Sequence, residues 1–139
     1  MRHPAAQRTP RDRGVAAVEF ALLLPMLLLL IFGIIDFGRA LNTQITLTQA
    51  AREGARLAAL GQSSANVTSA TQNAATGLTP VTVTVTTCPA GAGATANGTV
   101  QVNYKFSFIT PLAAISSLFG SSLGSTMTLT ATGVMPCET

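Results

Sequence analysis

A single long apolar segment limits what this chain can fold into. From Val15 to Ile35 the only charged side chain is Glu19. As an α-helix this segment would be about 31 Å long, and the hydrocarbon core of a bilayer is about 30 Å thick. The charge-free part, residues 20–35, would reach only about 24 Å. We therefore expect a transmembrane helix over residues 15–36, with Glu19 near one edge of it.

The charges on either side of this segment predict its orientation. Residues 1–14 contain four arginines and one aspartate, whereas Asp36 and Arg39 on the far side cancel. Positively charged flanks stay in the cytoplasm. We therefore expect a basic cytoplasmic leader over residues 1–14, a single membrane crossing, and an exported domain over residues 37–139. The formal net charge of +3 resides in the leader, so it indicates membrane orientation and no nucleic-acid binding.

A cleaved secretory signal peptide is the alternative for the N-terminal region. Such a peptide has an apolar core of about 7–15 residues followed by small residues. Here the apolar segment is longer and is followed by Asp36-Phe37-Gly38-Arg39, which favours a retained anchor. Residues 1–13 lack apolar periodicity, and we expect them to be disordered. Pro25 lies within the apolar segment and predicts a local bend or a loosened turn near Ala21 to Pro25, which membrane helices tolerate.

Placing the charged side chain of Glu19 within a membrane segment costs free energy. A carboxylate at the centre of a membrane helix costs about 2.5–3.5 kcal/mol on insertion scales, and less near the interface. An acid within a membrane segment is therefore a candidate functional residue, because it needs a cationic partner. The alternative is that Glu19 extends to the cytoplasmic interface and stays hydrated there.

The beginning of the exported part is predicted to be helical. Apolar and small residues recur every three or four positions over residues 37–60, starting with Leu41 and Ile45. The membrane helix should therefore continue outside the bilayer. Gly61 is a suitable residue to end it, and a second helix is expected over residues 63–76.

The rest of the exported part is predicted to form strands. Apolar residues alternate with threonine and other polar residues over about 81–87, 99–109 and 125–134. Asn97-Gly98 is typical of a hairpin turn, and Pro111 to Phe119 predicts a short helix with proline in its first turn. The expected fold class is α+β: a long N-terminal helix followed by a small antiparallel sheet that packs one apolar face against it.

Few side chains in the exported part could carry out chemistry. Cys88 and Cys137 both lie on the exported side and predict one disulfide bond. The only histidine, His3, is in the leader, so no histidine base can activate a nucleophile in the exported domain. One histidine and two distant cysteines predict no metal site. We therefore expect a protein that is not an enzyme and that binds no cofactor.

Three sequence motifs resemble those of the TadE-like family. They are R-G-x-A-x-V-E-F-A-x-x-x-P at residues 13–25, D-x-x-R at residues 36–39, and A-x-R-E-G-A-R-x-A at residues 50–58. In addition, Gly14 followed by Glu19 and Phe20 at the start of an apolar segment resembles the processing site of type IV prepilins. The resemblance implies a pseudopilin-like component of a tight adherence (Flp) pilus system in the bacterial inner membrane.

The resemblance also implies roles for three residues. Gly14 would precede the bond that a prepilin peptidase cuts, and Val15 would become the new N-terminus. Glu19 would pair with the amino terminus of a neighbouring subunit. The implied partners are the inner membrane, the prepilin peptidase, other pilin-like subunits and pilus assembly proteins. For the segment Arg52 to Arg56, a solvated helix face with a close-packing glycine is as good an interpretation as a binding role.

Two functions remain open on the sequence alone. The first is a pseudopilin or minor pilin that enters or primes a filament. The second is an uncleaved bitopic anchor or assembly factor that presents an exported interaction domain. Cleavage after Gly14 separates the two.

Overall fold

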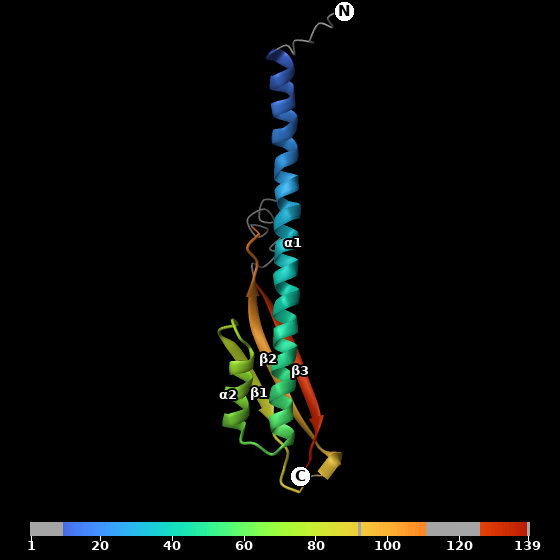
Figure 1. The fold of residues 1–139 in the computed structure, drawn as a ribbon, viewed down its shortest axis with the longest axis vertical. Helices are drawn as coiled ribbons and strands as arrows, with labels where there is room; N and C mark the ends of the chain where they lie inside the picture. Colours follow the sequence, from blue (N-terminus) through green and yellow to red (C-terminus); the bar gives the residue numbers. More distant parts are fainter. Residues whose placement is uncertain (1–9, 92, 111–125, 139) are drawn as a thin grey trace, which may run out of the picture.

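The computed structural model describes residues 10–91, 93–110 and 126–138, with side chains from residue 14 onward. One helix, α1 (Pro10–Ala59), extends along the whole molecule (Figure 1). At 1.5 Å per residue its 50 residues span about 75 Å. The other elements pack beside its C-terminal half: α2 (Ser64–Ala74), β1 (Val81–Thr86), the 3₁₀ turn η1 (Gly93–Thr95), β2 (Asn97–Ser107) and β3 (Thr126–Pro136).

The N-terminal half of α1 projects away from the other described elements (Figure 1). Within the described part of the chain, α1 is the one helix long and apolar enough to cross a bilayer, and its most apolar window has no residue buried within the chain. The helix begins at Pro10, so the expected disorder of residues 1–13 is wrong for residues 10–13. Proline suits this first position because its nitrogen has no hydrogen to leave unsatisfied.

Of the two alternatives expected near Pro25, a bend or a loosened turn, a sharp bend is absent. Residues on both sides of Pro25 are helical, and Figure 1 shows no sharp bend in α1. A proline removes one backbone hydrogen bond from the helix, and the hydrogen bonds of the neighbouring turns keep this helix continuous.

Helix α1 ends, and helix α2 begins, as the sequence predicts. Gly61 follows α1 with a φ of +71°, and the amides of Gly61 and Gln62 donate to the carbonyls of Ala58 and Leu57 at 3.1 and 3.2 Å. This arrangement satisfies carbonyls that the helix end would otherwise leave free. Ser63 caps α2, because its side chain accepts a hydrogen bond from the amide of Asn66 at 3.3 Å.

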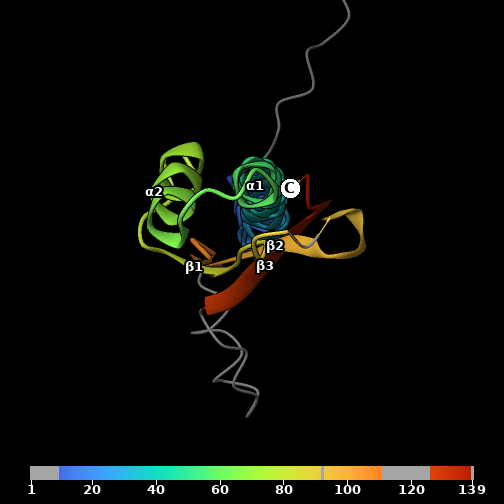
Figure 2. The same cartoon turned by 90° about the horizontal axis from the view of Figure 1, so that it is seen from below.

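The three strands form one antiparallel sheet in the order β1-β2-β3. Both helices lie on one face of this sheet, and α2 covers the β1 side (Figure 2). The threonines of the opposite face, such as Thr84 and Thr132, are exposed. The predicted α+β class, a long helix followed by a small three-stranded antiparallel sheet, is therefore confirmed.

The side chains between α1 and the sheet become larger toward the N-terminal half of α1. On β2 the side chains that face α1 grow along the strand, from Gly98 through Val100 and Val102 to Phe106, all of them buried. On β3, whose direction is opposite, they shrink toward Gly133. A Cβ on Gly98 would lie 3.0 Å from the backbone nitrogen of Ala59, so the sheet touches α1 most closely at this end.

Two details of the structure differ from what the sequence pattern indicates, and a third prediction falls outside the described residues. Leu41 and Ile45 are 51% and 57% exposed, because the face of α1 that meets the sheet instead carries Asp36, Thr43 and Leu47. Asn97-Gly98 forms no turn. Both residues belong to β2, and Gly98 is needed for its close approach to α1. The expected helix over residues 111–119 lies outside the described residues.

Candidate functional site

The predicted processing segment lies on the exposed N-terminal part of α1. Gly14, Val15 and Glu19 are all exposed, and Val15 and Glu19 are four positions apart, on the same side of the helix. A Cβ on Gly14 would meet no atom within 4 Å. Folding of this chain therefore does not require a glycine at position 14. The side chain of Glu19 makes no hydrogen bond or ion pair with any other part of the chain that the structure describes.

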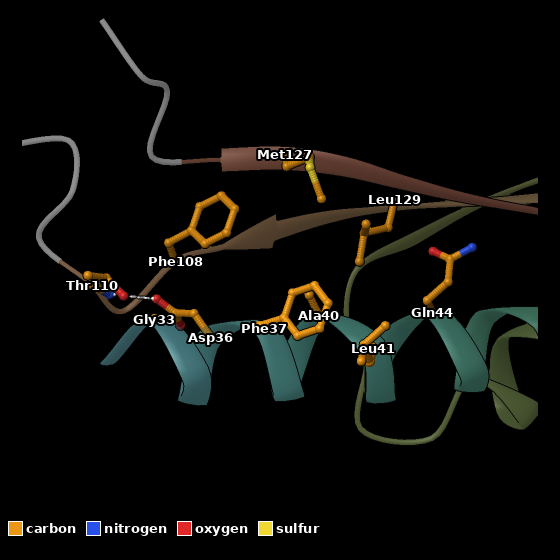
Figure 3. A pocket seen from close by; sticks show the side chains of 10 residues that line it. All are labelled: Gly33, Asp36, Phe37, Ala40, Leu41, Gln44, Phe108, Thr110, Met127 and Leu129. Atoms are coloured by element: carbon orange, nitrogen blue, oxygen red, sulfur yellow. Dashed lines mark hydrogen bonds between the residues drawn. The ribbon is translucent and has the colours of Figure 1, made fainter. Parts of the chain in front are cut away.

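The structure places a second charged residue, Asp36, at the junction between the candidate membrane helix and the C-terminal domain. Asp36 is 3% exposed. Its Oδ1 accepts a hydrogen bond from the amide of Ile109 at 3.0 Å, and its Oδ2 accepts one from the amide of Thr110 at 2.7 Å. The hydroxyl of Thr110 also donates to Oδ2 (Figure 3). These bonds hold the chain that leaves β2 against α1.

Arg39 completes this junction. Its Nη1 lies 3.0 Å from Oδ1 of Asp36 and 3.4 Å from the carbonyl oxygen of Ser107. Its guanidinium lies 5.1 Å from the centre of the Phe106 ring, which is within the range of a cation–π contact. Arg39 therefore neutralises Asp36 and also covers the end of β2. Because the carboxylate has four donors, its charge is tolerated despite its burial.

The segment Arg52 to Arg56 separates into two sets of residues. Gly54 and Ala55 are buried, and a Cβ on Gly54 would lie 2.2 Å from Oγ1 of Thr71 on α2. Glu53 and Arg56 form an exposed ion pair of 3.1 Å. Hydrogen bonding to Arg56 lowers the pKa of Glu53, and the same contact raises the pKa of Arg56. The small residues thus form packing contacts, and the charged ones remain accessible, as Arg52 does.

Cys88 and Cys137 form a disulfide bond, with Cα atoms 5.8 Å apart. It joins the chain that follows β1 to the chain that follows β3, at the end of the domain farthest from the membrane segment (Figure 1). The amide of Glu138 also donates to the carbonyl of Ala59 at 3.3 Å. The end of the chain is therefore fixed both to the sheet and to α1.

The sequence showed Asp36 and Arg39 as cancelling charges and as part of a family motif, but it did not show their structural role. The spacing of the two residues on a helix predicts an ion pair. No sequence signal identifies Ile109 and Thr110, which are more than seventy positions away, as donors to Asp36. The predicted roles of Gly14, Val15 and Glu19 concern other molecules, and they stay predictions.

Comparison with known proteins adds one match. Residues 14–56 match the family model described as TadE-like protein. The TadE-like resemblance is confirmed. The matched TadE-like segment starts at the glycine of the predicted processing site, contains the apolar segment and the Asp36–Arg39 pair, and ends at Arg56. Neither the curated proteins nor the solved structures gave a significant match.

Proposed function

We propose that this chain is a pseudopilin-like or minor pilin-like component of a tight adherence (Flp) pilus system. It is held in the bacterial inner membrane by the N-terminal half of α1, with the leader in the cytoplasm and the exported domain in the periplasm or beyond. The observation that carries this proposal is the TadE-like match over residues 14–56, which coincides with the candidate membrane helix. The protein acts by association and not by catalysis.

The proposal includes cleavage between Gly14 and Val15 by a prepilin peptidase. Two observations support it. The bond lies on an exposed part of α1, and the fold itself does not require Gly14. A glycine that no packing contact requires can instead serve an enzyme whose pocket excludes a Cβ.

The test is the N-terminus of the protein isolated from native membranes. Intact-mass measurement should find a chain that begins at Val15, and Gly14→Val should leave the uncut chain. Gly38→Val is the matched control, because Gly38 is also helical and a Cβ there also meets nothing within 4 Å. This control should be cut normally. A wild-type chain that begins at Met1 would exclude processing and favour the uncleaved bitopic anchor.

A further inference from the structure

An apolar pocket of about 440 Å³ lies between α1 and the sheet, at the end where the larger side chains of β2 and β3 face α1. One wall is α1 from Gly33 to Gln44, and the other includes Phe108, Met127 and Leu129 (Figure 3). Its volume falls within the range of about 300–1,000 Å³ that is typical of ligand pockets. None of the proposed functional residues Gly14, Val15 and Glu19 contributes to it.

The two ends of the pocket differ in their surroundings. One end is at Gly33 and Asp36, within the proposed membrane segment, and the other is at Gln44. The side-chain amide of Gln44 donates to the carbonyl of Thr130 at 3.0 Å and so bridges α1 and β3 at that end. From Gly33 to Gln44 the helix rises about 16 Å. The pocket therefore extends from the outer edge of the hydrocarbon core into the headgroup layer.

The walls of the pocket suit a hydrocarbon chain. They are almost entirely apolar, and the one charged group, Asp36, already accepts hydrogen bonds from Ile109, Thr110 and Arg39. Phe37, which lines the pocket, and Ile109, which lies between the lining residues Phe108 and Thr110 in the sequence, are 67% and 61% exposed. The described wall residues that come from β2, β3 and the chain after β2 carry no charge: Phe108, Thr110, Met127 and Leu129.

We propose that this pocket binds an acyl chain of a lipid from the outer leaflet of the membrane. At the depth of Gly33 and Asp36 the surrounding medium is lipid, so hydrocarbon is the apolar ligand present at the highest concentration. An occupied pocket would hold the exported domain on the membrane surface. This proposal depends on membrane anchorage and not on pilus function.

The test uses the absence of tryptophan from the chain. Met127→Trp places a single tryptophan at the pocket wall, and Phe108→Trp is a second, more conservative probe. The full-length proteins are reconstituted in phosphatidylcholine vesicles with plain or acyl-brominated chains. Bromine quenches tryptophan only at close contact. Both variants should lose fluorescence in the brominated vesicles.

Two controls separate the possible failures. Leu27→Trp lies in the proposed membrane segment, where residue 27 is exposed, and it should be quenched by brominated lipid. Val134→Trp lies at the far end of β3, at a 56% exposed position, and should not be quenched. Absence of quenching at Leu27→Trp would exclude membrane anchorage itself.

Three outcomes would overturn the lipid proposal while leaving anchorage intact. In the first, Leu27→Trp is quenched but neither pocket probe is. In the second, the pocket probes emit at short wavelength without bromine quenching, which would mean that protein covers the pocket, either residues 111–125 or a second copy. In the third, Val134→Trp is quenched as strongly as the pocket probes, so that the signal does not report on the pocket.

Discussion

The closest contact between α1 and the sheet predicts that Gly133→Ala strongly destabilises the C-terminal domain. A Cβ on Gly133 would lie 2.2 Å from the carbonyl oxygen of Ala51 and 3.0 Å from the amide nitrogen of Arg52. An ordinary carbon–oxygen approach is about 3.3 Å. The obstructing atoms belong to the helix backbone and cannot rotate away, so α1 and β3 would have to separate locally by about 1 Å.

The expected loss follows from the general cost of overpacking. One extra carbon in a well-packed core costs about 1–3 kcal/mol, and a clash with backbone lies at the upper end of that range. The higher strand preference of alanine opposes the clash by less than about 1 kcal/mol. We therefore expect the free energy of unfolding to fall by about 2–3 kcal/mol. For a domain of about 100 residues this lowers Tm by roughly 10–20 °C.

The assay is thermal unfolding of the full chain in detergent, followed by the near-ultraviolet circular dichroism of Tyr104. Tyr104 is the only tyrosine and lies on β2 against the core. Gly38→Ala is the control, because a Cβ there meets nothing within 4 Å, and it should leave Tm unchanged or slightly raised. If Gly133→Ala unfolds at the wild-type temperature, the inferred close approach of β3 to α1 is wrong.

Three further predictions concern the junction, the disulfide and the membrane segment. Asp36→Asn should increase hydrogen exchange at the amides of Ile109 and Thr110 by roughly tenfold or more, because these donors lose a charged acceptor. Unchanged exchange rates would show that Asp36 does not hold this segment against α1. Replacing Cys88 and Cys137 together by alanine should lower the free energy of unfolding by about 4 kcal/mol in the chain-entropy model, and chemical denaturation that gives the wild-type midpoint would refute this. Glu19→Gln should still be cut after Gly14 but should no longer co-purify with pilus components, because only the charge that pairs with a partner amine is lost. Undiminished co-purification would support the alternative in which Glu19 is hydrated at the interface.

The sequence predicted the elements that depend on local pattern. Gly61 ends α1, Ser63 caps α2, and the alternation of valine and threonine marks β1. These features follow from backbone geometry and from side-chain period. The pairing of the two cysteines was also predictable, because the exported part contains no other thiol.

The sequence predictions were wrong where contacts between residues far apart in the sequence determine which side chains are buried. The face of α1 that meets the sheet carries a buried Asp36, while the more apolar Leu41 is half exposed. Periodicity alone cannot show this, because the partner that makes the burial of Asp36 tolerable is the chain after β2, more than seventy positions away. Gly98 was likewise assigned to a turn, although its lack of a side chain serves the contact with α1.

The continuity of α1 has a mechanical consequence. No loop separates the N-terminal half of α1 from the half that packs on the sheet, because a single continuous helix carries both. Tension or torque applied at the N-terminal end would therefore pass directly into the domain. The rest of the domain is attached to α1 at three positions along the helix. These are the hydrogen bonds of Asp36 with Thr110 and of Gln44 with Thr130, and the backbone contact at Gly133. Such contacts along one axis are loaded together in shear, so a pull on the N-terminal half of α1 would move the folded domain with it as one body.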